Sequence, residues 1–309
     1  MLCPAPVVRA VLIEPALPVA LEPLSADGSW CGLSLVNHAL IERVLEDLAR
    51  AGIREVRLLH QKGNGRAASL VGLGGRWGLE LHVESIGAGT PPSADDAAAS
   101  VGHGPTLFLR LDCWPGAEGL RALLQGSCVP QRRLAGPGGA LPCSVFAGGS
   151  QRIDSTVYCR DSLQVATLAD YWSASMELLA RLHQTNHLER ALEGQRFIGA
   201  GARLHRSAQV DGPCLIGSGA FVARGCGIGP RSIVGDGVYL DAQVRISDSI
   251  VLGDCHVESG AQLHGVVVTG DQVHCWRTGR VLAFDRTVVL PKRWPALRSV
   301  IAGPAPARS

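Results

Sequence analysis

Residues 198–252 read IGAGARLHRSAQVDGPCLIGSGAFVARGCGIGPRSIVGDGVYLDAQVRISDSIVL. An aliphatic residue recurs at every sixth position, and small residues, often Gly or Ala, lie between these positions. An α-helix repeats every 3.6 residues and a strand every two, so neither element explains a six-residue repeat. The ten aliphatic residues in register are Ile198, Leu204, Val210, Ile216, Val222, Ile228, Val234, Leu240, Ile246 and Leu252.

A hexapeptide β-helix explains this spacing, because each group of six residues forms one short strand and one corner. The stretch resembles the left-handed parallel β-helix family, in which three hexads make one triangular coil. One residue is dropped after Leu252, and the pattern resumes at Val257 and Leu263. We therefore predict a β-helix over residues 196–275 and a C-terminal tail over 276–309. Within the tail, further strands are predicted at Val281–Phe284 and Thr287–Leu290.

Composition narrows the class of protein. The 309 residues carry 29 Lys and Arg against 27 Asp and Glu, and this near balance lacks the basic field of a nucleic-acid-binding protein. No apolar run reaches the roughly 18 residues of a membrane span, and the N-terminus lacks the basic region of a signal peptide. The ten cysteines form no CxxC pair, which favours buried thiols over a zinc site. We expect a cytoplasmic protein.

Strands and helices alternate over residues 1–195, which we predict to be an α/β domain. A helical pattern begins at Asn37, which can cap the helix, and ends at Gly52. Because it lies between two strands, it predicts a parallel pair with a right-handed crossover. A later helix is predicted over Asp170–His183, whereas residues 113–150 show no clear periodicity. The predicted strands are Val7–Ile13, Glu55–His60, Leu79–Glu84 and Thr106–Leu111.

Several segments of this first half are similar to the sugar-1-phosphate nucleotidyltransferases, such as mannose-1-phosphate guanylyltransferase. That family has a Rossmann-like α/β domain followed by a left-handed β-helix, the order predicted here. The region after Asp112 is shorter than in the family. The segments that carry the resemblance are AVLIEPALPVALEPLS (10–25), LVNHALIERVLEDLARAG (35–52), VGLGGRWGLELHVES (71–85) with Gly89 and Thr90 after it, TLFLRLD (106–112) and LQVATLADYWSASMELL (163–179).

The first departure from the family is in the phosphate-binding loop, whose glycines present backbone N–H groups to the nucleotide. Pro15, Ala16 and Pro18 occupy the matching glycine positions, and proline has no N–H to donate. The loop arginine is replaced by Ala20, and the lysine after the loop matches Cys31. The acidic residues Glu14 and Glu22 bracket the loop and leave Arg9 as the only basic residue before it.

The second departure is in the metal site that the resemblance implies. Family members hold Mg²⁺ with two aspartates; Asp112 matches the first, but Gln164 stands where the second would be. Glutamine offers a carbonyl oxygen and no charge. Gly89 and Thr90 are weak candidates for binding a cofactor. We therefore expect no catalytic residues and no cofactor, with Mg²⁺ at Asp112 only if the protein is active.

Three functions follow from these patterns. The first is a noncatalytic nucleotidyltransferase-like protein that assembles or regulates enzymes of sugar-nucleotide or polysaccharide metabolism. The second is an active sugar-1-phosphate nucleotidyltransferase that uses displaced ligands. The third is a hexapeptide-repeat acyltransferase with a histidine base. The histidines on or beside the repeat are His205, His256, His264 and His274.

The exposed faces of a short β-helix predict association with other subunits. We expect a homo-oligomer formed through the β-helix, or a hetero-oligomer with an active nucleotidyltransferase. His183 and His187 have the i, i+4 spacing of metal ligands on a helix, but Gln184 stands where an HExxH motif has glutamate, so we favour a structural or surface role.

Overall fold

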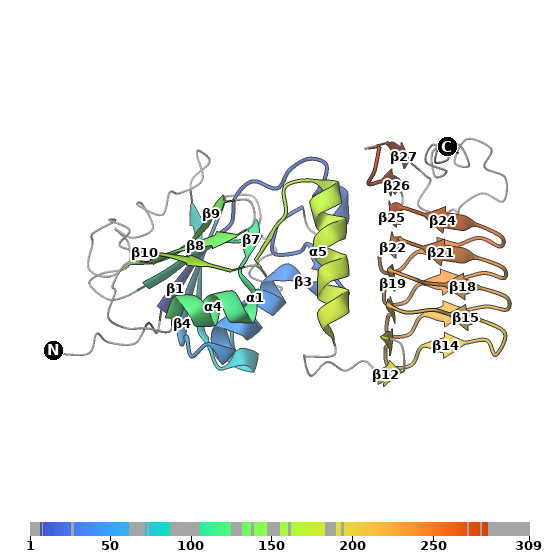
Figure 1. Cartoon of the computed structure of the whole chain (residues 1–309), viewed down its shortest axis with the longest axis horizontal. Coiled ribbons are helices and arrows are strands. Elements are labelled where there is room, and N and C mark those ends of the chain that lie inside the picture. Colours follow the sequence, from blue (N-terminus) through green and yellow to red (C-terminus); the bar gives the residue numbers. More distant parts are fainter. Residues whose placement is uncertain are drawn as a thin grey trace, which may run out of the picture. The chain divides into compact units, whose positions relative to one another are not determined.

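The computed structural model describes residues 7, 9–25, 28–61, 72, 74–86, 106–124, 132–136, 139–146, 155–159, 162–182, 190–192, 195–270, 272–278 and 280–283. The chain forms two compact units (Figure 1). The first unit comprises residues 1–34 and 38–166, and the second comprises residues 35–37 and 167–309. The domain limits at 195 and 275 stay predictions, because these units follow three-dimensional contacts and place the helix after residue 167 with the second unit.

The first unit is built on a seven-stranded mixed sheet with the order β10-β8-β9-β6-β1-β4-β5. Strands β6, β1, β4 and β5 are parallel to one another, which confirms the predicted parallel pair of β1 and β4. Strand β9 runs antiparallel to β6 and β8, so the sheet is mixed. The strands are β1 (Arg9–Ile13), β4 (Glu55–Gln61), β5 (Glu80–Ile86), β6 (Thr106–Arg110), β8 (Arg132–Gly136), β9 (Gly139–Phe146) and β10 (Ser155–Tyr158).

Helix α1 (Leu40–Arg50) connects β1 to β4 and buries the face that its sequence predicts. It ends as expected, because Gly52 has a φ of +90° and donates its N–H to the Ala49 carbonyl at 3.1 Å. Asn37 does not cap it. The N-cap is Ala39, which provides no side-chain hydrogen bond, and Asn37 lies between the short strands β2 (Ser34–Leu35) and β3 (His38–Ala39).

The segment without periodicity contains regular structure. Strand β7 (Cys113–Trp114) is followed by helix α4 (Gly116–Leu124), whose buried side includes Leu120 and Leu123. Two glycines in nine residues weaken the helical signal, because glycine disfavours helix interiors. Short 3-10 helices, η1 (Glu22–Leu24) and η2 (Gly75–Trp77), complete the described elements of the first unit, together with the two-residue strand β11 (Leu163–Gln164).

The second unit is a β-helix-like stack of parallel strands, as the hexad repeat predicts (Figure 1). Its three faces are referred to here as first, second and third. The first face contains β13 (Arg196–Ile198), β16 (Cys214–Ile216), β19 (Ser232–Val234), β22 (Ile250–Val251) and β25 (Val266–Val268). The second contains β14 (Arg203–Leu204), β17 (Phe221–Val222), β20 (Tyr239–Leu240) and β23 (His256–Val257). The third contains β15 (Gln209–Val210), β18 (Gly227–Ile228), β21 (Arg245–Ser247) and β24 (Gln262–His264).

Equivalent residues of successive coils stack inside the β-helix. Val222 pairs with Leu240, Leu240 pairs in turn with Val257, and Ile228 pairs with Ile246. The inward side chains form one continuous buried apolar cluster, to which most aliphatic residues of the repeat contribute. Antiparallel strands continue the first face at both ends of the stack. They are β12 (Arg190–Leu192), β26 (Gln272–Cys275) and β27 (Val281–Ala283).

The dropped residue lies earlier than predicted. Ile233 follows Ile228 by five positions, but their partners Ile250 and Ile246 are only four apart. Val251, not Leu252, therefore stacks on Val234 and faces the core. The shortened corner turns at Asp248, which adopts a left-handed conformation with a φ of +50°. This conformation is more accessible to aspartate than to most residues with a side chain.

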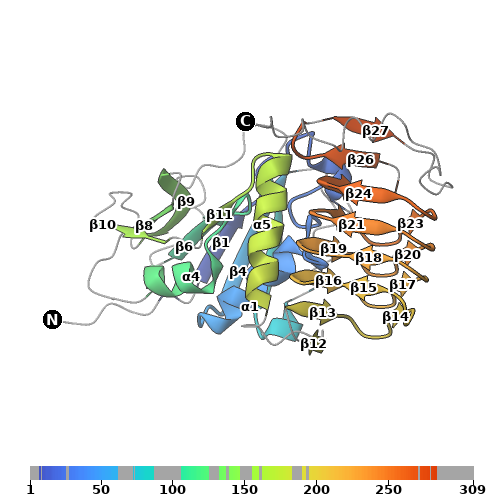
Figure 2. The same cartoon turned by 45° about the vertical axis from the view of Figure 1, so that its right-hand side comes forward.

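Helix α5 (Leu168–Arg181) lies along the first face of the β-helix (Figures 1 and 2). It begins two residues before the predicted Asp170 because Thr167 and Asp170 form a capping box. In the described part of the chain, no helix combines the length and apolar character needed to cross a membrane. The predicted strand at Val281–Phe284 is present as β27, whereas Thr287–Leu290 lies outside the described residues.

Candidate functional site

The candidate site lies at the carboxyl edge of the sheet in the first unit. Strands β1 and β6 are parallel neighbours, with Ile13 paired to Arg110, so the segments that follow them start side by side. The loop that begins at Glu14 follows β1, and Asp112 follows β6. Ligands of open α/β sheets bind at this edge. The structure therefore brings the predicted loop and the predicted metal ligand to one place.

Gln164 joins Asp112 through a short antiparallel pair. In this pair, Gln164 of β11 lies opposite Cys113 of β7, and the Val165 N–H donates to the Asp112 carbonyl at 3.0 Å. The two positions that the resemblance assigns to metal-binding aspartates are thus adjacent, although they lie 52 positions apart in the sequence.

The Arg110 guanidinium contacts the Asp112 carboxylate, which is the only acid kept at these two positions. Arg110 Nε lies 3.1 Å from Asp112 Oδ1, and Arg110 Nη2 lies 2.6 Å from Asp112 Oδ2. Such a bidentate pair neutralises the carboxylate and occupies both of its oxygens. Mg²⁺ prefers several oxygen ligands, with charge supplied by carboxylates. An engaged aspartate and an uncharged glutamine do not fit that requirement, so these residues are poorly suited to hold the ion.

The loop after β1 is closed by its own neighbours. The Trp30 indole N–H donates to the Ala16 carbonyl at 3.3 Å, and Trp30 is buried. The Leu21 N–H donates to the Pro18 carbonyl at 2.8 Å. Pro15 and Pro18 have no N–H groups, while Ala20 brings no charge to the loop. These contacts stabilise a loop that offers few backbone donors to a phosphate.

Glu14 introduces a buried acid at the start of this loop. Its Oε1 accepts a hydrogen bond from the Cys31 N–H at 3.1 Å, and its side chain is 1% exposed. Cys31, which matches the family lysine, is itself fully buried. An anion brought within about 4 Å of this carboxylate would experience a repulsion of about 4 kcal/mol at an effective dielectric constant of about 20.

Arg9 cannot compensate for this acid. It begins β1, whereas the loop follows the other end of the strand, and it forms an ion pair with Glu55 at 2.9 Å. Glu22 is exposed in η1. Gly89 and Thr90, the weak cofactor-binding candidates, lie outside the described residues. The roles assigned to these positions stay predictions.

Two residues of this site were missed by the sequence analysis. Arg110 stands two positions before Asp112, a spacing that places side chains on the same side of an extended chain. That spacing could have predicted the ion pair. Trp30 carries no such signal, because its contact with Ala16 depends on how the chain folds back over 14 residues.

A buried acid also lies beside the site. Trp114, which follows Asp112 by two residues, donates its indole N–H to Asp47 Oδ2 of α1 at 3.0 Å. Burial raises the pKa of Asp47 to about 6, and the hydrogen bond from Trp114 opposes part of that rise. The folded protein therefore holds a proton on Asp47 at a pH where the unfolded chain has released it.

We expect the Asp47→Asn variant to be more stable than the wild type at pH 7 but not at pH 4. Protonation of Asp47 stabilises the fold fully below the ordinary pKa of 3.8, and this contribution is lost as the pH rises through about 6. Two pKa units correspond to about 3 kcal/mol, so the expected gain at pH 7 is about 1–3 kcal/mol. Urea denaturation at both pH values measures it. The matched control is Glu46→Gln, at a more exposed neighbour, and an equal gain at both pH values would contradict the explanation.

The histidines of the second unit do not gather into one site. His205 is hydrogen-bonded to Ser207 at 2.8 Å, and His256 faces Asp241 at 3.3 Å. His264 lies on the third face, and His274 is buried in β26. Within the described residues, no group of three or more His, Cys, Asp or Glu side chains could hold a metal ion. His183 and His187 lie outside those residues.

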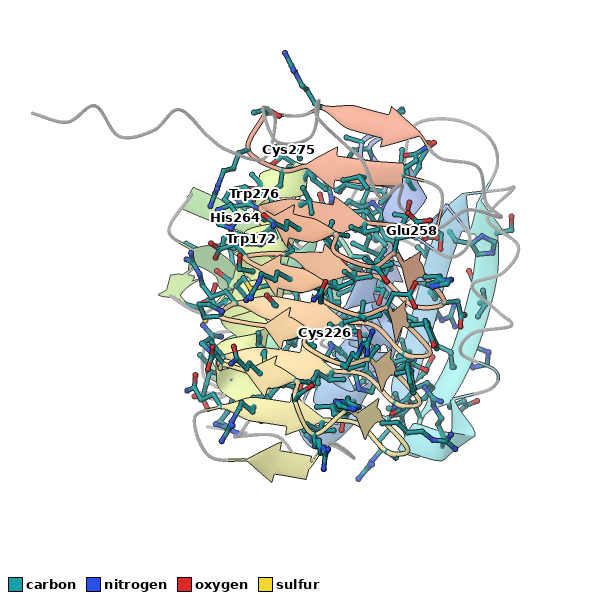
Figure 3. The ribbon with its side chains drawn as sticks, turned by 90° about the vertical axis from the view of Figure 1, so that its right-hand side faces the viewer. Trp172, Cys226, Glu258, His264, Cys275 and Trp276 are labelled. Carbon is teal, nitrogen blue, oxygen red and sulfur yellow. The ribbon has the colours of Figure 1, made fainter. Side chains whose placement is uncertain are left out.

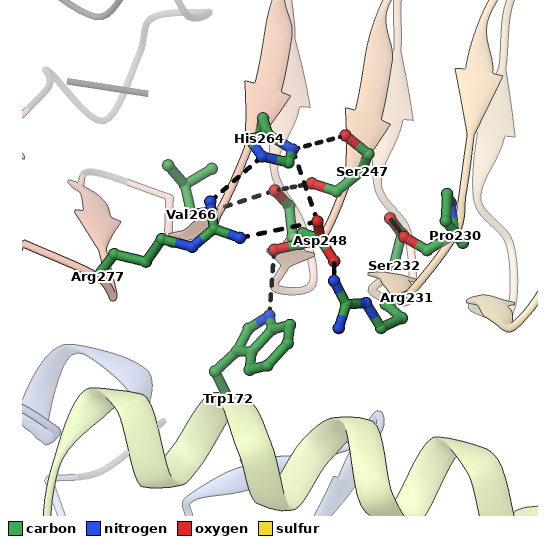
Figure 4. Close-up of polar contacts among 10 residues, drawn as sticks. Trp172, Pro230, Arg231, Ser232, Ser247, Asp248, His264, Val266 and Arg277 are labelled. Carbon is green, nitrogen blue, oxygen red and sulfur yellow. Dashed lines mark hydrogen bonds and ion pairs between the residues drawn. The ribbon is translucent and has the colours of Figure 1, made fainter. Parts of the chain in front are cut away.

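Four ionisable side chains meet at the shortened corner of the β-helix (Figure 4). Asp248 Oδ1 forms an ion pair with Arg231 at 2.5 Å, and Asp248 Oδ2 lies 3.8 Å from both Arg277 and His264. Trp172 of α5 donates its indole N–H to the Asp248 carbonyl at 3.1 Å and stacks on Trp276 at 4.2 Å. Figure 3 places Trp172, His264 and Trp276 together. This cluster anchors α5 to the coil.

The stacked coils define the second unit as a β-helix-like protein module, and the first unit is a mixed α/β sheet at whose edge β7 and β11 bring Asp112 and Gln164 together. Residues 210–289 match the family model described as the GMPPB C-terminal domain. This match supports a mannose-1-phosphate guanylyltransferase-like family and suggests a sugar-1-phosphate nucleotidyltransferase-like protein. It lies within the second unit, not in the unit that carries the candidate site. A comparison with curated proteins gives no match.

Proposed function

We propose that this chain is a noncatalytic nucleotidyltransferase-like protein with an assembly or regulatory role in sugar-nucleotide or polysaccharide metabolism. The observation that carries the proposal is the bidentate contact of Arg110 with Asp112, at the position where the resembling enzymes place a metal-binding carboxylate. The guanidinium cation of Arg110 pairs with the Asp112 carboxylate in place of the Mg²⁺ ion that the reaction needs.

The closed loop supports the same conclusion. Nucleotidyl transfer depends on positioning and on electrostatic stabilisation of charged phosphates. Here the loop lacks amide donors at Pro15 and Pro18, and Glu14 adds a buried negative charge. Each lost charge-assisted hydrogen bond weakens phosphate binding by about 1.5–3 kcal/mol. Several such losses together remove most of the affinity that a nucleotide needs.

The partner in this proposal is another subunit. A protein that keeps the nucleotidyltransferase fold but not its catalytic residues acts by binding other subunits. Its β-helix offers exposed faces for such binding. The candidates are a second copy of this chain and an active nucleotidyltransferase of the same fold, in the cytoplasm where sugar nucleotides are made. The comparison with inactive family members that serve as regulatory subunits is an analogy at the level of the fold.

The proposal predicts no nucleotidyl transfer. We expect the full-length protein to release no pyrophosphate above a protein-free control, for any pairing of the common nucleoside triphosphates with hexose 1-phosphates in the presence of Mg²⁺. A coupled pyrophosphate assay measures this. Turnover that disappears in Asp112→Asn but persists in Glu118→Gln, a matched loss of an exposed carboxylate on α4, would instead establish an active enzyme with displaced ligands.

A further inference from the structure

The corner between the second and third faces of the β-helix changes the sign of its charge along the stack. Four coils meet at this corner: coil one contains β14 and β15, coil two β17 and β18, coil three β20 and β21, and coil four β23 and β24 (Figure 2). Coils one and two carry His205, Arg206 and Arg224 there, whereas coils three and four carry Asp241 and Glu258. The positive charge is therefore confined to two coils.

Arg206 and Arg224 occupy equivalent positions of adjacent coils. Strand β14 pairs with β17 and β15 pairs with β18, both with an offset of 18 residues, and these two arginines have the same offset. Neighbouring strands lie about 4.8 Å apart, so the two side chains begin one strand spacing apart. Both are exposed, and neither forms an ion pair with a described residue. Like charges this close repel each other, and an anion bound between them removes the repulsion.

A glycine brings a further arginine toward this corner. Gly227 follows Arg224 by three residues and pairs with Arg245 of coil three. A Cβ atom at Gly227 would lie 3.2 Å from Arg245 Nη1 and 3.8 Å from its Cγ, so the arginine side chain lies across the glycine, toward coil two. Arg203, at the outward position of β14, adds a fourth exposed arginine. Neither Arg203 nor Arg245 forms an ion pair with a described residue.

Hydrogen bonds within the corner make His205 a further donor. The Gly225 N–H donates to Ser207 Oγ at 3.0 Å, and this oxygen lies 2.8 Å from His205 Nδ1. The Ser207 N–H donates to the same Nδ1 at 3.2 Å. A ring nitrogen that accepts a hydrogen bond carries no proton, so the neutral imidazole holds its proton on Nε2. Among the described residues Nε2 has no hydrogen-bond partner, so it is available to a ligand.

We propose that this basic corner binds a chain of phosphate groups, either a free polyphosphate or the triphosphate of a nucleotide. Each guanidinium offers a fork of N–H donors that matches phosphate oxygens. A phosphate chain also brings several negative charges within the length of two coils, whereas a single carboxylate would neutralise only one arginine. The inference goes beyond the proposed function and does not depend on it. The basic corner consists of Arg203, His205, Arg206, Arg224 and Arg245.

An extended nucleic acid fits this corner less well. The basic stretch covers two coils, or about 10 Å along the stack. A longer polyanion that follows the corner would next meet coils three and four, where Asp241 and Glu258 would repel it. Asp241 faces His256 at 3.3 Å and forms no ion pair with the arginines of the corner. The ligand is therefore short.

The corner is exposed, and this sets the expected affinity. We expect free tripolyphosphate to bind the full-length protein with a dissociation constant of about 10–100 μM at about 50 mM NaCl. Binding should weaken at least about tenfold at about 0.5 M NaCl, because salt screens exposed charges. Isothermal titration calorimetry without Mg²⁺ measures both values.

A parallel titration with GTP distinguishes the two sources of a phosphate chain. Tighter binding of GTP than of tripolyphosphate would assign the corner to a nucleotide, whose base then adds contacts. Equal or weaker binding of GTP would assign it to the phosphate chain alone. In both cases the substitutions described next should weaken binding, because the phosphates contact the same arginines.

Substitutions test the charge and the geometry of the corner separately. We expect Arg206→Gln and Arg224→Gln each to weaken tripolyphosphate binding about fivefold, and the double variant to weaken it about 20-fold or more. Gly227→Ala removes no charge, but its methyl group displaces the Arg245 side chain, so binding should weaken about two- to threefold. Circular dichroism verifies that each variant is folded.

Arg280→Gln is the matched control, because Arg280 is an exposed arginine that follows the fourth coil. It should change the dissociation constant by less than about 1.5-fold, since salt screens distant charges. Absence of binding at about 1 mM tripolyphosphate would overturn the proposal. Equal weakening by Arg280→Gln and Arg206→Gln would also overturn it, because binding would then follow net charge alone. The experiment alters no residue of the first unit, so its failure would leave the predicted absence of turnover intact.

Discussion

Val251→Asp is expected to unfold the β-helix or to destabilise it by about 5 kcal/mol or more. Val251 is fully buried and stacks between Val234 and Val268 of the adjacent coils. A carboxylate there would be buried without a partner, and an uncompensated buried charge typically destabilises a protein by several kcal/mol. Urea denaturation followed by far-ultraviolet circular dichroism measures the effect. Should this variant fail to fold, Val251→Ala should still fold and lose about 2–3 kcal/mol.

Leu252→Asp is the matched control for this prediction. Leu252 follows Val251 directly and has similar chemistry, but it is partly exposed and lies outside the core cluster. We expect a loss of no more than about 1 kcal/mol. If Leu252→Asp were the more damaging of the two, the inward row would continue through Leu252, and the shortened corner would lie after that residue.

These two residues show why the repeat predicted the architecture but not its irregularity. The six-residue period depends on many positions at once, so the β-helix is predicted by the whole pattern. The position of a missing residue depends on one or two positions. Val251 and Leu252 are both aliphatic, and either can continue the period. Strand pairing distinguishes them, because Val234 pairs with Val251.

The first 60 residues show a similar division. Buried strands and α1 were predicted because apolar periodicity is a local property of the chain. The role of Asn37 was mistaken because its side chain contacts residues far along the sequence. It donates to the Val234 carbonyl at 3.3 Å and lies 3.4 Å from Asp236 Oδ1. A helix cap and a distant hydrogen bond use the same side-chain groups, and the sequence does not distinguish them.

The sequence predicted the location of the candidate site more fully than it predicted the side-chain contacts within the site. The resemblance placed Asp112 and residue 164 together, and β7 and β11 do pair. The two-residue spacing of Arg110 and Asp112 could have predicted their contact. The contact of Glu14 with the Cys31 N–H was not, because it joins residues 17 apart through a loop of irregular structure. The sequence therefore shows which family residues are substituted at this site. It does not show which new contacts replace the contacts that those residues would make.

The shortened corner connects the irregularity of the repeat to the position of α5. With one residue fewer, the chain turns at Asp248 itself, whose carbonyl accepts the Trp172 indole N–H. Arg231 and Arg277 approach the Asp248 carboxylate from the adjacent coil and from the segment after β26. Residues from three separate parts of the second unit thus depend on one turn.

Trp172→Ala is expected to destabilise the second unit by about 3–5 kcal/mol, because it removes a large buried ring, its stack on Trp276 and its hydrogen bond. The inward core of the β-helix does not include Trp172, so the loss should concentrate on α5. Hydrogen exchange should therefore increase most over Leu168–Arg181 and least over β17 and β20, which lie on a face that α5 does not cover.

Trp172→Phe separates the ring from its hydrogen bond. It keeps an aromatic surface against Trp276 and leaves the Asp248 carbonyl without its indole donor, so we expect a loss of about 1–2 kcal/mol. A double-mutant cycle with Trp276→Ala should give a coupling of about 0.5–1.5 kcal/mol for the stacked pair. If Trp172→Ala and Trp172→Phe had equal and small effects, α5 would be held by its other contacts, and the Asp248 corner would not be its anchor.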